Sequence, residues 1–248
     1  VGYVYPEAHT GMDFFDALDA AARPHVERKP WMAECTMTLI TTEAALSVVV
    51  DECIAAGKYS IDLESTGLDN RVVDGRTVDR IVGVCLSPDG VKGYYVPILH
   101  TDHADKCVPP SAAHRQLSRL TASNAIAVFH NAKFDQEFLQ FNGWGAPLGE
   151  WDKPSQWEDT LILAYLRNTR ERNKGLKHLS KAELGMEMIE LEELFTEDEI
   201  NAHGKNFGIL DPSWEPALWY ACSDAICTYR LEKKIYAGAI EPRDGLPS

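Results

Sequence analysis

The sequence has no cysteine pattern of the kind that holds a zinc ion or a disulfide framework. Its six cysteines form no C-x-x-C and no paired spacing, which argues against the usual zinc modules and secreted disulfide scaffolds. It also lacks a membrane-spanning run, because the best apolar run, AALSVVV, is far shorter than the roughly 20 residues a helix needs. We therefore expect a protein of the reducing cytoplasm that has no membrane partner.

An excess of basic charge is missing as well. The chain has 24 basic and 38 acidic residues and a net charge of −14 at pH 7. Taken alone, this balance argues mildly against a nucleic-acid partner, although metal ions and a local basic patch can supply the positive field that a polyanion needs. There is also no internal repeat, no G-x-S-x-G and no Cys/His signature, so we expect no protein nucleophile.

What the sequence does contain is a run of strand and helix patterns followed mostly by helices. Its 248 residues, 45% of them hydrophobic, suffice for one large α/β domain. Expected strands cover residues 35–40, 58–69 and 125–130, with two more between 79 and 98 joined by a turn at 88–90. Expected helices cover residues 41–57, 111–121, 131–143, 158–167 and 216–235. The pattern predicts an α/β fold with a central mixed sheet flanked by helices.

Acidic residues occur at three unusual places in this pattern. In the strand KYSIDLESTGLD, Asp62 and Glu64 are two residues apart and therefore share one face. Asp135 lies on the helix after the strand AIAVFH, and Asp224 lies on the last helix with Tyr220 four residues earlier on the same face. Four converging carboxylates would repel one another, and divalent cations such as Mg²⁺ or Mn²⁺ would relieve the repulsion. Taken singly, each acid is more simply read as a solvated surface residue.

Three stretches of the sequence resemble a known set of motifs. SIDLESTGLD, FHNAKFDQEFL and YACSDA resemble the first, second and third exonuclease motifs of the DEDD superfamily, and the Y-x-x-x-D form is that of its tyrosine subgroup. Within that subgroup the chain is most similar to the proofreading 3′-5′ exonuclease domain of family A DNA polymerases. GYYVPILH, EDTLILAYL and GLKHLSKAELG extend the similarity over roughly residues 37–236. The resemblance implies an RNase H-like fold.

The resemblance also implies a mechanism and a role for each motif residue. Two divalent ions, Mg²⁺ or Mn²⁺, would carry out in-line hydrolysis of a phosphodiester. Asp62, Glu64 and Asp224 would hold the ion that activates the attacking water. Asp62 would also bind the second ion together with Asp135, and Tyr220 would orient the water.

Further residues match positions where the family contacts the substrate. Thr66 and Leu68 stand where a hydroxyl or backbone contact and an apolar wedge between terminal bases are expected. Asn131 and Lys133 match positions beside the strand leaving the site, and Asp159 matches a supporting acidic position.

The most basic part of the chain is residues 167–181, with six Lys or Arg against one Glu. It is either a solvated loop and helix face or a source of phosphate contacts, for which the candidates are Arg170, Arg172, Lys174, Lys177 and His178; we assign His178 to the nucleic-acid-binding set. His100 is expected in an exposed loop.

The resemblance divides the chain into an N-terminal extension of unknown role (1–34), an exonuclease domain (35–240) and a tail (241–248). The expected substrate is a single-stranded or frayed 3′ end of DNA in a bacterial or phage-infected cell. The polymerase domain of the same or another chain is a possible partner. Two alternatives stay open: an exoribonuclease resembling RNase D, and a non-catalytic replisome interaction domain. The acidic balance, the absence of a trailing helical RNA-binding domain and the polymerase-like GLKHLSKAELG disfavour the first, and the intact acids disfavour the second.

Overall fold

The structure of the chain is a computed structural model that describes residues 23–69, 71–73, 76–142 and 157–240. The expected tail and the first 22 residues of the expected extension lie outside these ranges. Within them, Val26 and Met32 are buried in the core, and residues Pro30–Glu34 form the 3₁₀ turn η1.

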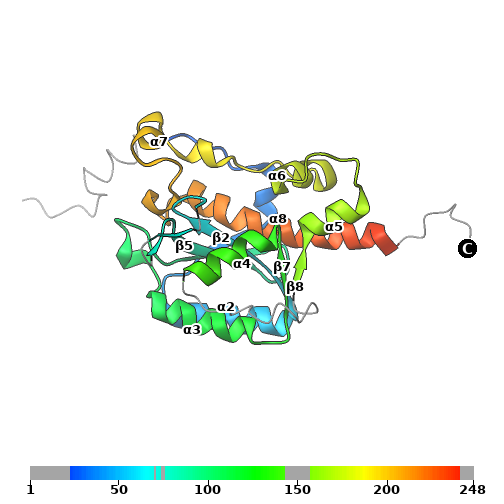
Figure 1. The fold of residues 1–248 in the computed structure, drawn as a ribbon, viewed down its shortest axis with the longest axis horizontal. Helices are drawn as coiled ribbons and strands as arrows, with labels where there is room; N and C mark the ends of the chain where they lie inside the picture. Colours follow the sequence, from blue (N-terminus) through cyan, green and yellow to red (C-terminus); the bar gives the residue numbers. More distant parts are fainter. Residues whose placement is uncertain (1–22, 70, 74–75, 143–156, 241–248) are drawn as a thin grey trace, which may run out of the picture.

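A six-stranded mixed sheet forms the centre of the molecule (Figure 1). Its strands, in spatial order, are β1 (Thr36–Leu39), β6 (Lys92–Pro97), β5 (Ile81–Ser87), β2 (Lys58–Ser65), β7 (Ile126–Phe129) and β8 (Trp157–Asp159). The β6–β5 and β5–β2 pairs are antiparallel, and the other three pairs are parallel. The predicted central mixed sheet flanked by helices is confirmed.

Helices α2 (Glu43–Ala56) and α3 (Pro110–Thr121) cover one face of the sheet (Figure 1). The start of α2 is set by Thr42, whose side chain accepts a hydrogen bond from the Ala45 amide at 3.2 Å. Its end is set by Gly57 in the left-handed conformation, with φ of 72°. The apolar sides of both helices meet alternate residues of β2 and β5 in the larger of the core clusters.

Helix α8 (Glu215–Ile240) crosses the opposite face of the sheet (Figure 1). Small residues at the contact let the helix approach closely: a Cβ on Gly93 would meet Cys222 Cβ at 2.7 Å. In addition, the Ser60 hydroxyl on β2 donates to the Ala225 carbonyl at 2.6 Å. The acids of β2 and of α8 are therefore brought to one interface.

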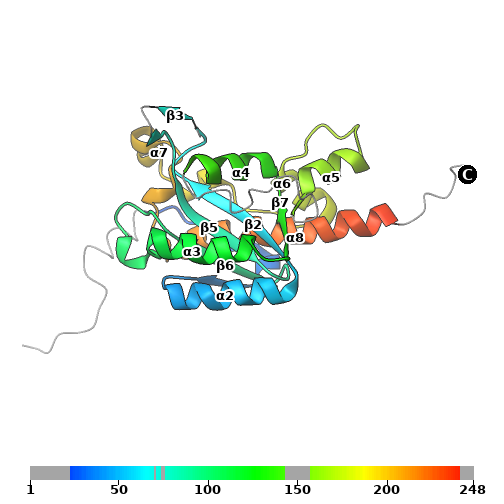
Figure 2. The same cartoon turned by 60° about the horizontal axis from the view of Figure 1, so that its bottom comes forward.

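Strand β8 and a small hairpin were not expected from the sequence. The strand β8 was missed because EDTLILAYLR reads as continuous helix, whereas α5 begins only at Thr160 (Thr160–Arg167). A small hairpin of β3 (Val72–Val73) and β4 (Arg76–Thr77) follows the first motif, and Figure 2 shows it standing apart from the main sheet. The expected helix after β7 is present as α4 (Ala132–Phe141).

Several short helical segments lie between α5 and α8 in the chain. They are α6 (Leu176–Leu179), the π-helical turn η4 (Ser180–Leu184), η5 (Leu191–Leu194), α7 (Glu197–His203) and η6 (Phe207–Ile209). Of these, α6, η4 and η5 pack on α8. Between β6 and α3 lies η2 (Ala104–Lys106). The expectation that His100 is exposed is wrong, because its ring is buried between Tyr95, at 2.6 Å, and the Leu210 carbonyl, at 2.8 Å. Across the described ranges, we find no helix with the length and hydropathy that a transmembrane span requires.

Candidate active site

The strand β2 directs two carboxylates toward α8. Asp62 pairs with Cys85 across the antiparallel β2–β5 ladder, and Glu64 pairs with Gly83. The pairing shifts by a residue directly after Glu64, so a bulge ends the regular strand at the carboxylates. Bulges of this kind turn a strand and redirect its side chains, and here the chain leaves the sheet toward the loop that follows.

Helix α8 brings Tyr220 and Asp224 to the same place. Together with β2 they line a cleft of about 520 Å³, which we call the carboxylate cleft. Its lining residues are Asp62, Leu63, Glu64, Ser65, Gly67, Leu68, Phe134, Leu191, Lys205, Phe207, Tyr220 and Asp224. Asp135 is buried on α4 and does not line the cleft, but its charge is close enough to raise the pKa of both Asp62 and Glu64.

All four acids are electrostatically unfavourable in the protein alone. Burial, followed by the charge of Asp224, raises the pKa of Asp62 and of Glu64 well above the usual range. Burial also raises the pKa of Asp135, and it raises that of Asp224 to about 7. The positive charge of Lys177 lowers the pKa of Asp62, Glu64 and Asp224 without offsetting the effect of burial.

The donor atoms fit a hard divalent cation. Glu64 Oε1 and Asp224 Oδ1 are buried and have no hydrogen-bond partner within the described part of the chain. Unpaired buried carboxylate oxygens are costly, and a cation coordinated by them would remove the cost. Asp62 and Glu64 offer ligand atoms that lie, with Cys85 Sγ, within 4.8 Å of one another. Burial raises the pKa of the Cys85 thiol well above its usual range, so the thiol stays protonated and is a poor ligand for a hard cation.

Asp159 positions the helix that carries Asp135. Its carboxylate accepts hydrogen bonds from the Asn131 amide at 3.0 Å, the Ala132 amide at 2.9 Å and the Leu161 amide at 2.8 Å. It therefore caps the N-termini of α4 and α5 together. Asn131, at the start of α4, has φ of 73° and its side chain makes no capping bond. A supporting place for Asp159 agrees with this geometry.

The loop after β2 is held by Asp79. Its carboxylate accepts hydrogen bonds from the Thr66 hydroxyl and the Asp69 amide, both at 2.8 Å. It also lies so close to Gly67 that a Cβ there would meet its Oδ2 at 2.5 Å. These hydrogen bonds, which we call the Asp79 clasp, leave Leu68 80% exposed at the rim of the carboxylate cleft. Thr66 does not line the cleft, because its hydroxyl is engaged within the loop.

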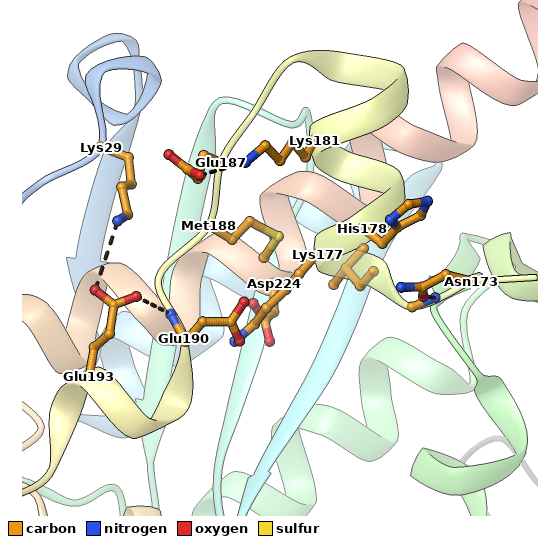
Figure 3. Close-up of a pocket in the computed structure, with 12 residues that line it drawn as sticks. Lys29, Asn173, Lys177, His178, Lys181, Glu187, Met188, Glu190, Glu193 and Asp224 are labelled. Atoms are coloured by element: carbon orange, nitrogen blue, oxygen red, sulfur yellow. Dashed lines mark hydrogen bonds and ion pairs between the residues drawn. The ribbon is translucent and has the colours of Figure 1, made fainter.

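Besides Thr66, three further predicted substrate contacts lie outside the carboxylate cleft. Asn131 and Lys133 are exposed on α4, and Lys133 lies 3.9 Å from Glu137. His178 lines a second cleft of about 610 Å³, which we call the lysine cleft (Figure 3). The lysine cleft is lined by Lys29, Asn173, Gly175, Leu176, Lys177, His178, Lys181, Glu187, Met188, Glu190, Glu193 and Asp224. Asp224 lines both clefts, so they are neighbours at that residue.

Several lining residues were not identified from the sequence. Phe134, on the helix that carries Asp135, is half-buried and lines the carboxylate cleft. Lys205 and Phe207 come from a stretch without clear periodicity, and only the fold brings them beside the acids. Phe207 packs on the Tyr220 ring with a centroid separation of 5.7 Å.

Known proteins similar to this chain include a polymerase. The model of a family described as 3′-5′ exonuclease, of the DNA polymerase A type, matches residues 37–237. DNA polymerase I of Chloroflexus aurantiacus is 29% identical over 234 residues, which is 92% of this chain and 21% of that protein. The chain therefore spans about a fifth of the length of the curated relative that it matches.

Solved structures share the fold at low sequence identity. RNase D of Trypanosoma brucei superposes with a TM-score of 0.61 at 15% identity, covering 86% of this chain and 67% of that one. The Nibbler EXO domain of Aedes aegypti gives 0.57 at 12% identity, covering 86% and 91%. Brucella melitensis NrnC with bound Mg²⁺ gives 0.51 at 20% identity, covering 73% and 72%. The fold is the RNase H-like fold of DEDD exonucleases, as expected from the motifs.

Proposed function

This chain belongs to the 3′-5′ exonuclease family of the DNA polymerase A type, and from that premise we propose that it removes nucleotides from the 3′ end of DNA, as a proofreading exonuclease does. One observation carries the proposal. Carboxylates from β2, α4 and α8 converge on one site, and two of their buried oxygens lack any hydrogen-bond partner in the described ranges. Buried charges of one sign destabilise the folded chain, and a cation bound between them would remove this cost.

We assign the metal-binding role to Asp62, Glu64, Asp135 and Asp224. Divalent ions held there, Mg²⁺ or Mn²⁺ and two in number on this proposal, would activate water and neutralise charge on the phosphate oxygens. Asp62 and Asp224 are partly exposed in the cleft and face the substrate side. Glu64 and Asp135 are buried behind them at 6% and 3% exposure.

Tyr220 is proposed to orient the attacking water. Its hydroxyl makes no hydrogen bond with the described part of the chain, and Asp224, Glu64 and Asp62 raise its pKa in that order after burial. The phenol therefore stays protonated and can donate to the water or accept from it. The resemblance of YACSDA to the third motif of the tyrosine subgroup implies the same role for Tyr220. Leu68 would act as the wedge at the terminal base, and Phe134 is placed to stack on it.

DNA rather than RNA is favoured by the similarity to a DNA polymerase, since that match covers nearly the whole chain. The proposal includes a bacterial cytoplasmic setting and a polymerase domain in the same or another chain. The direct test is a gel assay of 5′-labelled single-stranded DNA and RNA of one sequence, with Mg²⁺, Mn²⁺ or EDTA. Asp62→Ala serves as the inactive control.

A ladder shortening from the 3′ end of DNA, dependent on metal and absent in Asp62→Ala, would support the proposal. A ladder on RNA alone would replace it with an exoribonuclease activity. Absence of cleavage on both substrates would leave the interaction domain as the better account. Normal cleavage by Asp62→Ala would show that the site has been misassigned.

A further inference from the structure

The lysine cleft contains a lysine, Lys177, whose ammonium group lies against Tyr220 of the candidate active site. Lys177 is the second residue of α6, and its side chain is 26% exposed. Its ammonium lies 2.9 Å from Glu190 Oε2 and 4.8 Å from the centre of the Tyr220 ring. Figure 3 shows Lys177 reaching from the α6 side of the cleft toward Glu190, next to Asp224. It is thus fixed at one contact and placed over an aromatic face at the other.

Two side chains, those of Phe207 and Lys177, contact the Tyr220 ring. Phe207 packs against it with a tilt of 33° between the rings, and Lys177 approaches it as a cation. The hydroxyl has no hydrogen bond to the described residues that could fix its direction. The direction of the hydroxyl therefore depends on how the ring is held by these contacts.

The other lysines of the cleft do not share this contact. Lys29 lies 3.8 Å from Glu193 and Lys181 lies 2.8 Å from Glu187, so each is paired with a glutamate in the same way as Lys177. Neither lysine lies over an aromatic ring within the described part of the chain, and the Lys181 side chain is 69% exposed. The three pairs leave the cleft with little free positive charge, which does not suit a site built to hold a phosphate chain.

We propose that Lys177 is a positioning residue of the exonuclease reaction: anchored by Glu190, it holds the Tyr220 ring so that the phenol hydroxyl can orient the attacking water. This inference rests on the proposed function. On this account Lys177 contacts neither metal nor substrate and positions the water through the ring. Its charge also lowers the pKa of Asp62, Glu64 and Asp224, an effect that saturating Mg²⁺ removes from the kinetic comparison. Lys177 therefore contributes to turnover rather than to substrate affinity.

The kinetic test compares Lys177→Met with Lys181→Met, which removes an equal charge from the same segment. At saturating Mg²⁺ on single-stranded DNA, we expect Lys177→Met to lower kcat about tenfold with little change in KM, and Lys181→Met to change neither. Lys177→Arg should restore part of the loss, because a guanidinium also stacks on an aromatic face.

A double-mutant cycle separates positioning from substrate binding. In a Tyr220→Phe background the hydroxyl is gone, so adding Lys177→Met should produce no further loss of kcat. A full tenfold loss in that background, or a rise in KM with kcat unchanged, would overturn the inference and indicate a phosphate contact. Should Lys177→Met fail to fold, Glu190→Gln releases the same ammonium and should lower kcat in the same manner.

A second readout does not depend on activity. Tyrosine ring signals in ¹³C-labelled protein, assigned with Tyr220→Phe, should show the Tyr220 resonance shifted in Lys177→Met and unshifted in Lys181→Met. An unshifted Tyr220 resonance in Lys177→Met would overturn the inference. Failure of the proposed function is recognised separately, as wild-type protein that does not cleave in the presence of metal.

Discussion

Replacement of Asp224 by asparagine should stabilise the metal-free protein at neutral and alkaline pH. Burial raises the pKa of this carboxyl from 3.8 to about 7 in the folded chain. Between these two values the folded protein binds more protons than the unfolded one, so this group's contribution to stability falls as pH rises. Above pH 7 the ionised carboxylate remains in the folded state and its cost is complete.

The magnitude follows from the same pKa. At 1.36 kcal/mol per pH unit, ionised Asp224 costs the folded, metal-free protein about 4 kcal/mol at pH 8 and under about 1 kcal/mol at pH 4. Part of the stability gained by Asp224→Asn is lost again, because a buried amide also needs hydrogen bonds. We therefore expect Asp224→Asn to add about 2–4 kcal/mol at pH 8, or roughly 5–15 °C in Tm for a chain of this size.

The assay is thermal unfolding in EDTA and in Mg²⁺ at pH 4 and pH 8, with exposed Asp102→Asn as the control. Saturating Mg²⁺ at about 100 times its Kd should stabilise the wild type by about 2.7 kcal/mol and so remove most of the variant's advantage. A variant that is less stable than wild type in EDTA at pH 8 would refute the reasoning. So would an advantage of equal size at pH 4 and pH 8.

Three further outcomes follow from the site. Asp159→Ala should lower the free energy of unfolding by about 1–4 kcal/mol, because it uncaps both α4 and α5; chemical denaturation measures this, and a loss under about 0.5 kcal/mol would contradict the double cap. Asp79→Ala should raise KM more than it lowers kcat, because it frees the loop that presents Leu68; an unchanged KM in steady-state kinetics would disprove a role for the clasp. Tyr220→Phe should leave measurable activity where Asp62→Ala leaves none, and equal loss in single-turnover assays would show that the phenol does more than orient water.

The parts of the fold that follow a short sequence period were predictable. The strand around Asp62 alternates apolar and acidic positions, and the helix ending at Gly57 has a capping residue at one end and a left-handed glycine at the other. The three-residue strand β8 could not be separated from the helix after it, because its pairing with β7 is a tertiary contact that no local pattern encodes. The turns between residues 176 and 209 likewise owe their shape to packing on α8.

The site was predictable to the extent that its residues lie in motifs. The motif residues Asp62, Glu64, Tyr220 and Asp224 line one cleft. By contrast, the contact of Lys177 with Tyr220 joins residues far apart in the chain, and only the fold brings them together. Thr66 shows the converse, since its place in a motif did not reveal that Asp79 engages its hydroxyl.

The proposed reaction depends most directly on whether these carboxylates bind a divalent ion. Calorimetric titration of Mn²⁺ into metal-free wild-type protein and into Asp62→Asn at pH 8 measures this without substrate. The account predicts saturable binding by the wild type, weakened at least about tenfold in Asp62→Asn, since a ligand and a charge are lost together. Equal affinity in the two proteins, or no binding by the wild type, would contradict it.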